Sequence, residues 1–349
     1  MLVYQVFRKK CMILFLIIYF RTLKNNKDNN KMMRGGFVLF GASMLFVSFF
    51  FFYVLVFCEN DSNKRVIYLT QMAERGDKDA QTDLGMAYGE GFGVVKNYEK
   101  AAFWYSKAAT QGSVSALFNL GLFYEKGWGV TKNLQLAREF YSKAAVRGSV
   151  DAQVNLGVFY IHGLGGEIDY LRGRNLFLMA AEKKNTVALY NLGYIYNYGL
   201  GIPRDEKQAA KWYGKAAELG SMSARNSLAL YYSRGAGNLP VDRKRALDLL
   251  KSSACQGYAV AQNNLGILYL EGGDEISKDV RKSYAWFSVA FYNGAKIAND
   301  SRKKIAAYMD EKEAKEAEDL AHEYIMNYPA PINGSDTNKS DSQCRLPAY

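Results

Sequence analysis

Apolar and small side chains recur along the middle of the chain at an interval of 36 residues. The clearest markers are four glycines, each preceded by leucine and followed three residues later by tyrosine: Gly85, Gly121, Gly157 and Gly193. A repeating unit of this length holds two short helices, which cannot bury their apolar faces alone and must stack on neighbouring units. The pattern therefore predicts an all-α array of helix-turn-helix repeats.

The first unit shows how the pattern specifies each element. Ala80, Leu84 and Tyr88 share one face of a short helix, because residues four apart lie above each other on a helix. The glycine-rich stretch 89–93 predicts a turn, since glycine adopts positive φ angles without strain. A second helix is expected to follow, with paired aromatic and paired alanine residues on its buried face, and to end at Gly112.

Six units can be aligned in this way: residues 79–112, 115–148, 151–184, 186–220, 223–257 and 260–294. A glycine inside the first helix costs about 1 kcal/mol relative to alanine, so its recurrence indicates close approach of a packed helix. The fifth unit departs from the pattern. Ala229 stands at the glycine position, Leu249 and Leu250 replace the aromatic pair, and a loop is inserted at 235–240. We expect looser stacking there.

The units resemble the Sel-1-like repeat family in three features: Ala-x-x-x-Leu-Gly-x-x-Tyr, the loop Gly91-Phe92-Gly93-Val94, and the run Lys100-Ala101-x-x-Trp104-Tyr105-x-Lys107-Ala108-Ala109-x-x-Gly112. The resemblance covers residues 79–293. It implies tetratricopeptide-like helix pairs wound into a right-handed α/α superhelical solenoid. It also implies a protein-interaction scaffold, with no catalysis and no cofactor.

The segment before the repeats has the composition of a membrane-targeting segment. Residues 37–58 form an uncharged run of 22 residues, and a helix of that length crosses a bilayer core of about 30 Å. Basic residues precede the run while Glu59 and Asp61 follow it, so the positive-inside rule places the repeats on the far side of the membrane. The run is interpreted either as a retained transmembrane anchor or as a signal segment whose translation begins at Met32 or Met33.

In a bacterium, this topology predicts either an inner-membrane anchor with the repeats on the periplasmic side or export to the periplasm. The chain then divides into a basic segment, the apolar run, a linker with a capping helix, the repeats, C-terminal capping helices and a disordered tail. The corresponding ranges are 1–36, 37–58, 59–78, 79–294, 295–328 and 329–349.

The net charge of +11 does not indicate a nucleic-acid partner. Residues 1–36 hold eight basic residues and one acidic residue, so seven of the net positive charges precede the repeats and only four remain for the rest of the chain. A nearly balanced array without a basic stripe gives little attraction for a phosphate backbone.

The four cysteines show no paired spacing that would suggest a disulfide framework or a zinc site. Cys58 ends the apolar run, so lipidation is one reading of it, although Phe57 is bulky where a lipoprotein signal has a small residue. The other reading is a buried thiol at the membrane interface. A bridge between Cys255 and Cys344 is an option in an oxidising compartment, and the sequence does not require it.

The sequence contains no recognisable catalytic constellation. The two histidines, His162 and His322, are far apart along the chain, and an isolated histidine is more often a surface or packed residue than a ligand. The loop glycines have neither a preceding strand nor a following Gly-Lys-Ser/Thr, so they are interpreted as turns and not as a phosphate loop. We expect a protein that is not an enzyme and binds no metal or cofactor.

The inner surface of such a solenoid is the expected binding site for a partner protein or peptide. Positions two before and two after the leucine of the first helix, with one further turn, are the candidates for this groove. They are Phe118, Leu122, Glu125, Val154, Val158, Ile161, Tyr190, Tyr194, Asn197, Asn226 and Leu230, followed by Asn263 and Ile267. A register rotated by one position would instead place these residues in the core, and the sequence leaves both readings open.

Two classes of function are compatible with these features. The first is a membrane-tethered or exported adaptor whose concave face binds a partner protein in envelope signalling or assembly. The second is a polysaccharide-binding protein or enzyme subunit of the cell envelope, since the loop aromatics Phe92 and Trp128 can stack on sugars. A secreted effector is a further alternative.

Overall fold

The computed structural model describes residues 63–273 and 276–330, and these residues form an all-helical array. No β-strand is present within these two ranges, where a single isolated bridge joins Gly273 and Ile276. No helix in the described part of the chain combines the length and the apolar character needed to span a bilayer. The expected anchor or signal segment at 37–58 and the expected tail after residue 330 lie outside the described residues.

Each repeat contributes a first and a second helix of 13 residues. The first helices are α3 (Lys78–Glu90), α5 (Val114–Lys126), α7 (Val150–His162), α9 (Thr186–Tyr198), α11 (Met222–Arg234) and α13 (Ala259–Glu271). The second helices are α4 (Tyr98–Thr110), α6 (Leu134–Val146), α8 (Tyr170–Glu182), α10 (Glu206–Glu218), α12 (Arg243–Cys255) and α14 (Val280–Tyr292). Two C-terminal helices follow, α15 (Ala298–Ala306) and α16 (Glu311–Asn327).

Short polar side chains and glycines set the helix ends. The Asn97 side chain accepts from the Lys100 backbone N–H at the start of α4, at 2.9 Å, which satisfies a donor that the helix leaves unpaired. At the end of α3, Gly91 adopts the left-handed conformation with φ 78°. The expected turn began at residue 89, but the helix continues to Glu90, because Gly91 and not Gly89 supplies the positive φ angle.

The recurring glycine of each first helix lies under an aromatic ring from the second helix of the same unit. A Cβ atom at Gly121 would lie 2.5 Å from Tyr141 Cδ1, and one at Gly193 would lie 2.6 Å from Tyr213 Cδ1. Carbon atoms in contact are normally about 3.5–4.0 Å apart. The expected close approach is therefore present, and it is an approach of a ring to a helix backbone.

The fifth unit replaces this contact with a different pair of residues. Ala229 and Leu250 occupy the glycine and ring positions, and both are buried in one hydrophobic cluster. Leucine has no ring, so the space that glycine normally leaves can hold the alanine methyl group. The looser stacking expected for this unit is therefore wrong, because the two substitutions compensate for each other.

A side-chain hydrogen bond joins several units to the helix before them. Gln81, Gln153 and Gln262 each donate through Nε2 to the backbone carbonyl eight residues earlier, at 3.0, 3.5 and 3.0 Å. Arg225 Nε donates to Ala217 O in the same way, at 3.3 Å. The second and fourth units have Leu117 and Leu189 at this position, where a buried apolar contact takes the place of the hydrogen bond.

Both ends of the array are covered by further helices. Residues 63–74 are helical and receive the Gln81 hydrogen bond at Ala73, so this segment takes the place of a second helix before the first unit. At the other end, α16 packs on α14, and Trp286 lies 4.7 Å from Tyr324 and 5.3 Å from Tyr328 between ring centroids. These contacts shield the outermost repeats from solvent.

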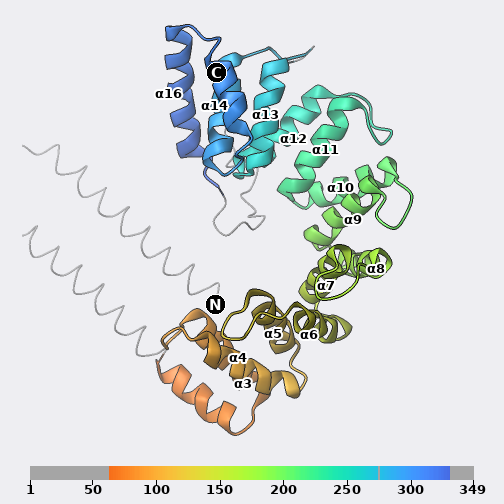
Figure 1. The fold of residues 1–349 in the computed structure, drawn as a ribbon, viewed down its shortest axis with the longest axis vertical. Coiled ribbons are helices and arrows are strands. Elements are labelled where there is room, and N and C mark those ends of the chain that lie inside the picture. The colour runs from red at the N-terminus through yellow and green to blue at the C-terminus, as the bar shows by residue number, and fades with distance from the viewer. Residues whose placement is uncertain (1–62, 274–275, 331–349) are drawn as a thin grey trace, which may run out of the picture.

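The stacked units form an open arc, with the first and last repeats at its two ends (Figure 1). Two pairs of successive first helices, α3 with α5 and α11 with α13, contact each other more extensively than any two second helices do. The first helices therefore follow the shorter, inner path. Figure 1 shows this arrangement where α5 and α7 face the opening of the arc and α6 and α8 lie outside it.

Candidate partner-binding groove

One apolar side chain per unit follows the packed glycine or alanine of the first helix. These six residues, here called the apolar row, are Met86, Leu122, Val158, Tyr194, Leu230 and Ile267. Leu230 and Ile267 are 40% and 39% exposed, and the other four are half-buried. Each side chain lies about 100° around the helix from the residue packed against the second helix. The row therefore runs along the inner surface of the arc.

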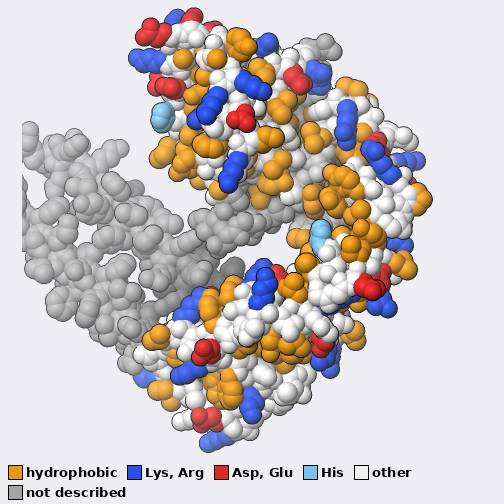
Figure 2. All heavy atoms as spheres, in the orientation of Figure 1, with side chains coloured by type: hydrophobic (Ala, Val, Ile, Leu, Met, Phe, Trp, Pro, Cys, Tyr) orange, Lys and Arg blue, Asp and Glu red, His pale blue; other side chains and the backbone are white. Residues whose placement is uncertain are grey.

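The middle of the row is aromatic. The rings of Tyr194 and Tyr198 lie 4.5 Å apart between centroids, and Tyr198 is 61% exposed. Figure 2 shows hydrophobic side chains gathered over α9 and α10 in the middle of the arc. Tyr198 was not among the residues predicted for the groove, although its position four residues after Tyr194 on the same helix face was a signal for it.

A second row of polar residues lies beside the apolar row. The residue before the leucine of the first helix is Asn119, Asn155, Asn191 or Asn264 in four units, Asp83 in the first and Ser227 in the fifth. We call these residues the amide row; all are half-buried. Asn119 and Asn191 donate to the backbone carbonyl four residues earlier, at 2.9 and 2.8 Å, which orients their amides. The groove prediction missed this row, although its 36-residue spacing is visible in the sequence.

Two predicted groove residues are held by tyrosine hydroxyls. Tyr141 donates to Glu125 Oε2 at 2.7 Å, and Tyr231 donates to Asn197 Oδ1 at 2.6 Å. Burial raises the pKa of both tyrosines above its ordinary value, so the hydroxyls keep their protons and act as donors. Glu125 and Asn197 thus have fixed orientations at the edge of the groove.

Three predicted groove residues are buried and do not line an open surface. Val154 and Ile161 belong to the hydrophobic cluster around Phe177, and Ile161 covers Gly173 of the facing helix. Asn226 accepts a hydrogen bond from Asn264 Nδ2 at 2.8 Å, between two first helices. The prediction was wrong for these three because their helix positions face neighbouring helices.

The remaining predicted positions divide in the same way. Phe118 and Tyr190 lean on the rings of Tyr141 and Tyr213, at 5.8 and 5.6 Å between centroids, so each is half-buried at the junction of its helix pair. Leu122, Val158, Tyr194, Leu230 and Ile267 form the larger part of the apolar row, and Asn263 is half-buried on α13. The predicted positions therefore divide into a surface set and a buried set, and binding at the surface set stays a prediction.

The loop aromatic Trp128 is packed onto the array. Its ring stacks on Tyr98 with centroids 5.3 Å apart and planes 10° from parallel, and it meets Phe123 edge-on at 5.8 Å. Gly129 adopts φ 63°, and a Cβ atom there would lie 2.2 Å from the Tyr98 carbonyl carbon. These contacts assign the loop glycine to a turn and a close backbone approach.

The described residues contain no group of three or more His, Cys, Asp and Glu side chains that could hold a metal ion. His162 is exposed at the end of α7. The exposed His322 lies 2.8 Å through Nδ1 from the Glu318 backbone oxygen.

A model of the Sel1 repeat matches six segments of the chain, residues 78–113, 114–149, 150–185, 186–221, 223–258 and 259–294. The chain belongs to the Sel1 repeat family. Proteins built from Sel1 repeats are generally interaction scaffolds and are typically non-catalytic. The six matched segments coincide with the six helix pairs of the array.

Solved structures of other Sel1 repeat proteins are similar to this chain. A Sel1 repeat protein from Oxalobacter formigenes is 34% identical with a TM-score of 0.62, and the match covers 68% of this chain and 94% of that one. A protective antigen of uropathogenic Escherichia coli with an SLR fold is 26% identical with a TM-score of 0.40, covering 76% of this chain and 72% of that one. No curated protein matches the chain.

Proposed function

We propose that this Sel1 repeat protein is a non-catalytic adaptor that holds an extended segment of a partner protein along its inner surface. The observation that carries the proposal is the pairing of the apolar row with the amide row on the first helices. An extended peptide presents side chains and backbone amides in alternation. The apolar row can contact the side chains, and the amide row can form hydrogen bonds with the backbone.

The two rows have different roles in this proposal. Side-chain amides carry both a donor and an acceptor, so Asn119, Asn155 and Asn191 can pair with the N–H and C=O groups of a peptide backbone. The apolar row then takes peptide side chains. Tyr194 and Tyr198 are the expected centre of affinity, because aromatic residues supply a large contact area at a low entropic cost.

We further propose that the array acts outside the cytoplasm, either tethered to a membrane or exported. Residues 37–58 are long and apolar enough for either role, and the basic residues before them support translocation of the repeats. Envelope signalling or assembly is the setting that this location favours. Protease added to intact and permeabilised cells tests the location. An exported array is cleaved when the outer membrane alone is permeabilised, whereas a cytoplasmic array stays intact until the inner membrane is opened as well.

The groove is tested by cross-linked affinity purification of the full-length chain from its own membranes. Leu122→Lys combined with Tyr194→Ala changes the apolar row, and we expect it to lose a partner that the unaltered chain recovers. The matched control is Leu171→Lys combined with Met179→Ala, which makes the same kind of change at exposed positions of the second helix α8. Equal recovery of the partner by both double variants would contradict a groove on the inner surface.

A further inference from the structure

The last residue of α12, Cys255, is buried and disulfide-bonded. It is the only cysteine among the described residues, so its partner is one of the three others in the chain, Cys11, Cys58 or Cys344. Cys11 and Cys58 precede the first unit in the sequence, and the helices of that unit, α3 and α4, lie near the other end of the arc from α13 and α14, which follow α12 (Figure 1).

The described chain ends next to Cys255. The Ala330 N–H donates to Asn293 Oδ1 at 2.9 Å, and Asn293 Nδ2 donates to Gln262 Oε1 at 2.9 Å. Gln262 Nε2 in turn donates to the carbonyl of Ala254, the residue before Cys255, at 3.0 Å. Residues 331–344 extend to at most about 46 Å at roughly 3.3 Å per residue. Cys344 therefore reaches Cys255 with a large excess of chain.

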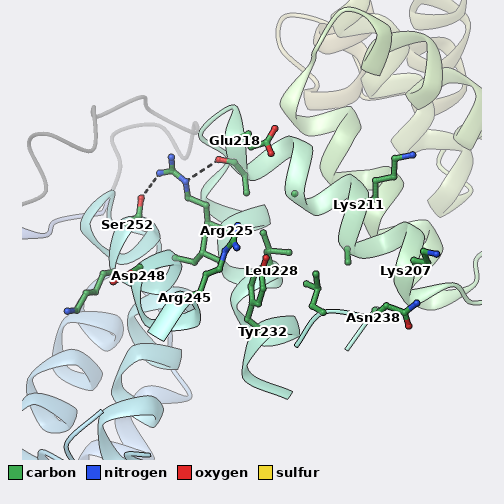
Figure 3. Close-up of a pocket in the computed structure, with 17 residues that line it drawn as sticks. Lys207, Lys211, Glu218, Arg225, Leu228, Tyr232, Asn238, Arg245, Asp248 and Ser252 are labelled. Atoms are coloured by element: carbon green, nitrogen blue, oxygen red, sulfur yellow. Dashed lines mark hydrogen bonds between the residues drawn. The ribbon is translucent and has the colours of Figure 1, made fainter. Parts of the chain in front are cut away.

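A cavity of about 1070 Å³ opens beside this cysteine, between α10, α11 and α12 (Figure 3). Lys251 and Ser252 line the cavity and lie one helical turn before Cys255 on the same helix. Leu249 also lines it, at the position where other units have a larger aromatic residue such as Trp104 or Trp212. The third unit also has a leucine here, Leu176, so the cavity is lined at this point by one of two units that lack the larger ring.

The cavity combines an apolar floor with a basic wall. Leu228, Leu239 and Leu249 supply the apolar surface. Five basic residues line it against two acidic ones, Glu218 and Asp248; the basic residues are Lys207, Lys211, Arg225, Arg245 and Lys251. Arg225 is fixed in the wall by a hydrogen bond to Ser252 Oγ at 2.6 Å (Figure 3). A ligand that fits this cavity is apolar and carries a negative charge.

We propose that a Cys255–Cys344 disulfide straps the C-terminal segment 331–349 to the array and docks its last residues in this cavity. The five residues after Cys344 reach about 17 Å when extended, at roughly 3.3 Å per residue. Arg345 comes first, Leu346, Pro347 and Tyr349 are apolar or aromatic, and the chain ends in the terminal carboxylate. The apolar side chains match the leucine floor, and the terminal carboxylate, four residues beyond Arg345, matches the basic wall.

Formation of the strap is a thiol–disulfide exchange. The two cysteine thiols lose two protons and two electrons as their sulfurs bond, and a protein disulfide oxidant is reduced to a dithiol. The strap is independent of the groove proposed above, because it uses α10, α11 and α12 rather than the apolar row. In the oxidised chain the cavity holds the chain's own C-terminus, and reduction releases that segment.

Two measurements on the full-length oxidised chain test the proposal. Peptide mapping under non-reducing conditions is expected to recover one species that joins the peptides of Cys255 and Cys344. Tryptic cleavage after Arg345 is expected to be about 10-fold slower in the oxidised chain than after reduction, because proteolysis follows the population of the undocked segment. The Cys344→Ser variant is expected to be cleaved after Arg345, without any reductant, as fast as the chemically reduced chain.

A charge-reversal variant separates docking from the disulfide itself. Lys211→Glu with Arg245→Glu should keep the linked peptide but cleave after Arg345 at the fast rate. The matched control, Lys78→Glu with Lys107→Glu in the first unit, should stay protected. Absence of the linked peptide would overturn the strap, and equal cleavage rates in the oxidised and reduced chains would overturn the docking.

Discussion

The glycine of the first helix is the residue on which the packing of each unit depends. Its periodic recurrence predicted a close approach, but the sequence did not identify the ring that makes it. Gly121 and Tyr141 lie in the same unit, and the ring rests directly on the helix backbone. The compensating pair Ala229 and Leu250 could not be predicted either, because the sequence does not show that both residues are buried in the same hydrophobic cluster.

Gly121→Ala is predicted to destabilise the array. The new methyl group would lie 2.5 Å from Tyr141 Cδ1, and overpacking of this kind costs about 1–3 kcal/mol in the free energy of unfolding. Denaturant unfolding of the two chains measures the difference. The control is Gly214→Ala in α10, where a Cβ atom meets nothing within 4 Å and the gain in helix propensity is expected to stabilise by about 0.5–1 kcal/mol.

The fifth unit suggests a rescue of that variant. Adding Tyr141→Leu to Gly121→Ala reproduces the Ala229 and Leu250 pair in the second unit. The double variant should lose less stability than the sum of the two single variants, with a coupling of about 0.5–3 kcal/mol. Strict additivity in the double-mutant cycle would mean that the ring contact does not explain the glycine.

Buried tyrosines predict a loss of stability at high pH. Burial raises the pKa of Tyr328 to about 12 and raises that of Tyr141 further, while an unfolded tyrosine ionises near pH 10. A raised folded pKa contributes stability that is complete below about pH 10 and is lost as the pH rises through the folded value. Tyrosinate absorbance should therefore rise in two phases, with the late phase accompanying loss of helix. A single phase near pH 10 with the helices intact would contradict this assignment.

At the scale of elements, the helix pattern could be predicted and the contacts between units could not. The apolar stripe of Ala80, Leu84 and Tyr88 predicted the first helix because residues four apart share one face. The hydrogen bond between units could not be predicted from the sequence, because its donor position holds glutamine in some units and leucine or arginine in others. Gln81 and Gln153 donate to equivalent carbonyls, a similarity that only the packed units reveal.

Gln262→Leu is predicted to be far more damaging than Gln153→Leu. Leucine occupies this position natively as Leu117, so its shape fits between units. Gln262, however, donates to Ala254 O and Tyr328 O and accepts from Asn293 Nδ2. Each buried group left without a partner costs about 1–3 kcal/mol.

Thermal unfolding of the two leucine variants measures this difference. Gln153 has a single hydrogen bond of 3.5 Å to Ala145 O, so its loss should lower Tm only slightly. Gln262 also ties α13 to Tyr328 after α16, so its variant should release the C-terminal cap first. Similar Tm values for both variants would show that the hydrogen bonds to Tyr328 O and Asn293 do not hold the cap.

At the scale of the whole molecule, curvature decides which side chains can meet a partner. The sequence predicted an inner surface but set its register too close to the core, which is why Val154, Ile161 and Asn226 were included. The error has two physical causes. Val154 and Asn226, two positions before the leucine, face neighbouring helices. Ile161, five positions after it, covers Gly173 of the second helix in its own unit. The register became clear only from the ring contacts that define the packed side of each first helix.

Site-specific photo-cross-linking in the full-length chain tests the inner groove most directly. A photoreactive phenylalanine analogue placed at Tyr194 or Leu230 probes the apolar row, and the same analogue at Leu171 or Met179 probes exposed positions on the second helix α8. The account predicts an adduct with one partner segment at both groove positions and none at the two control positions. Equal adducts at all four positions, or adducts only on α8, would contradict the central claim that the inner surface binds the partner.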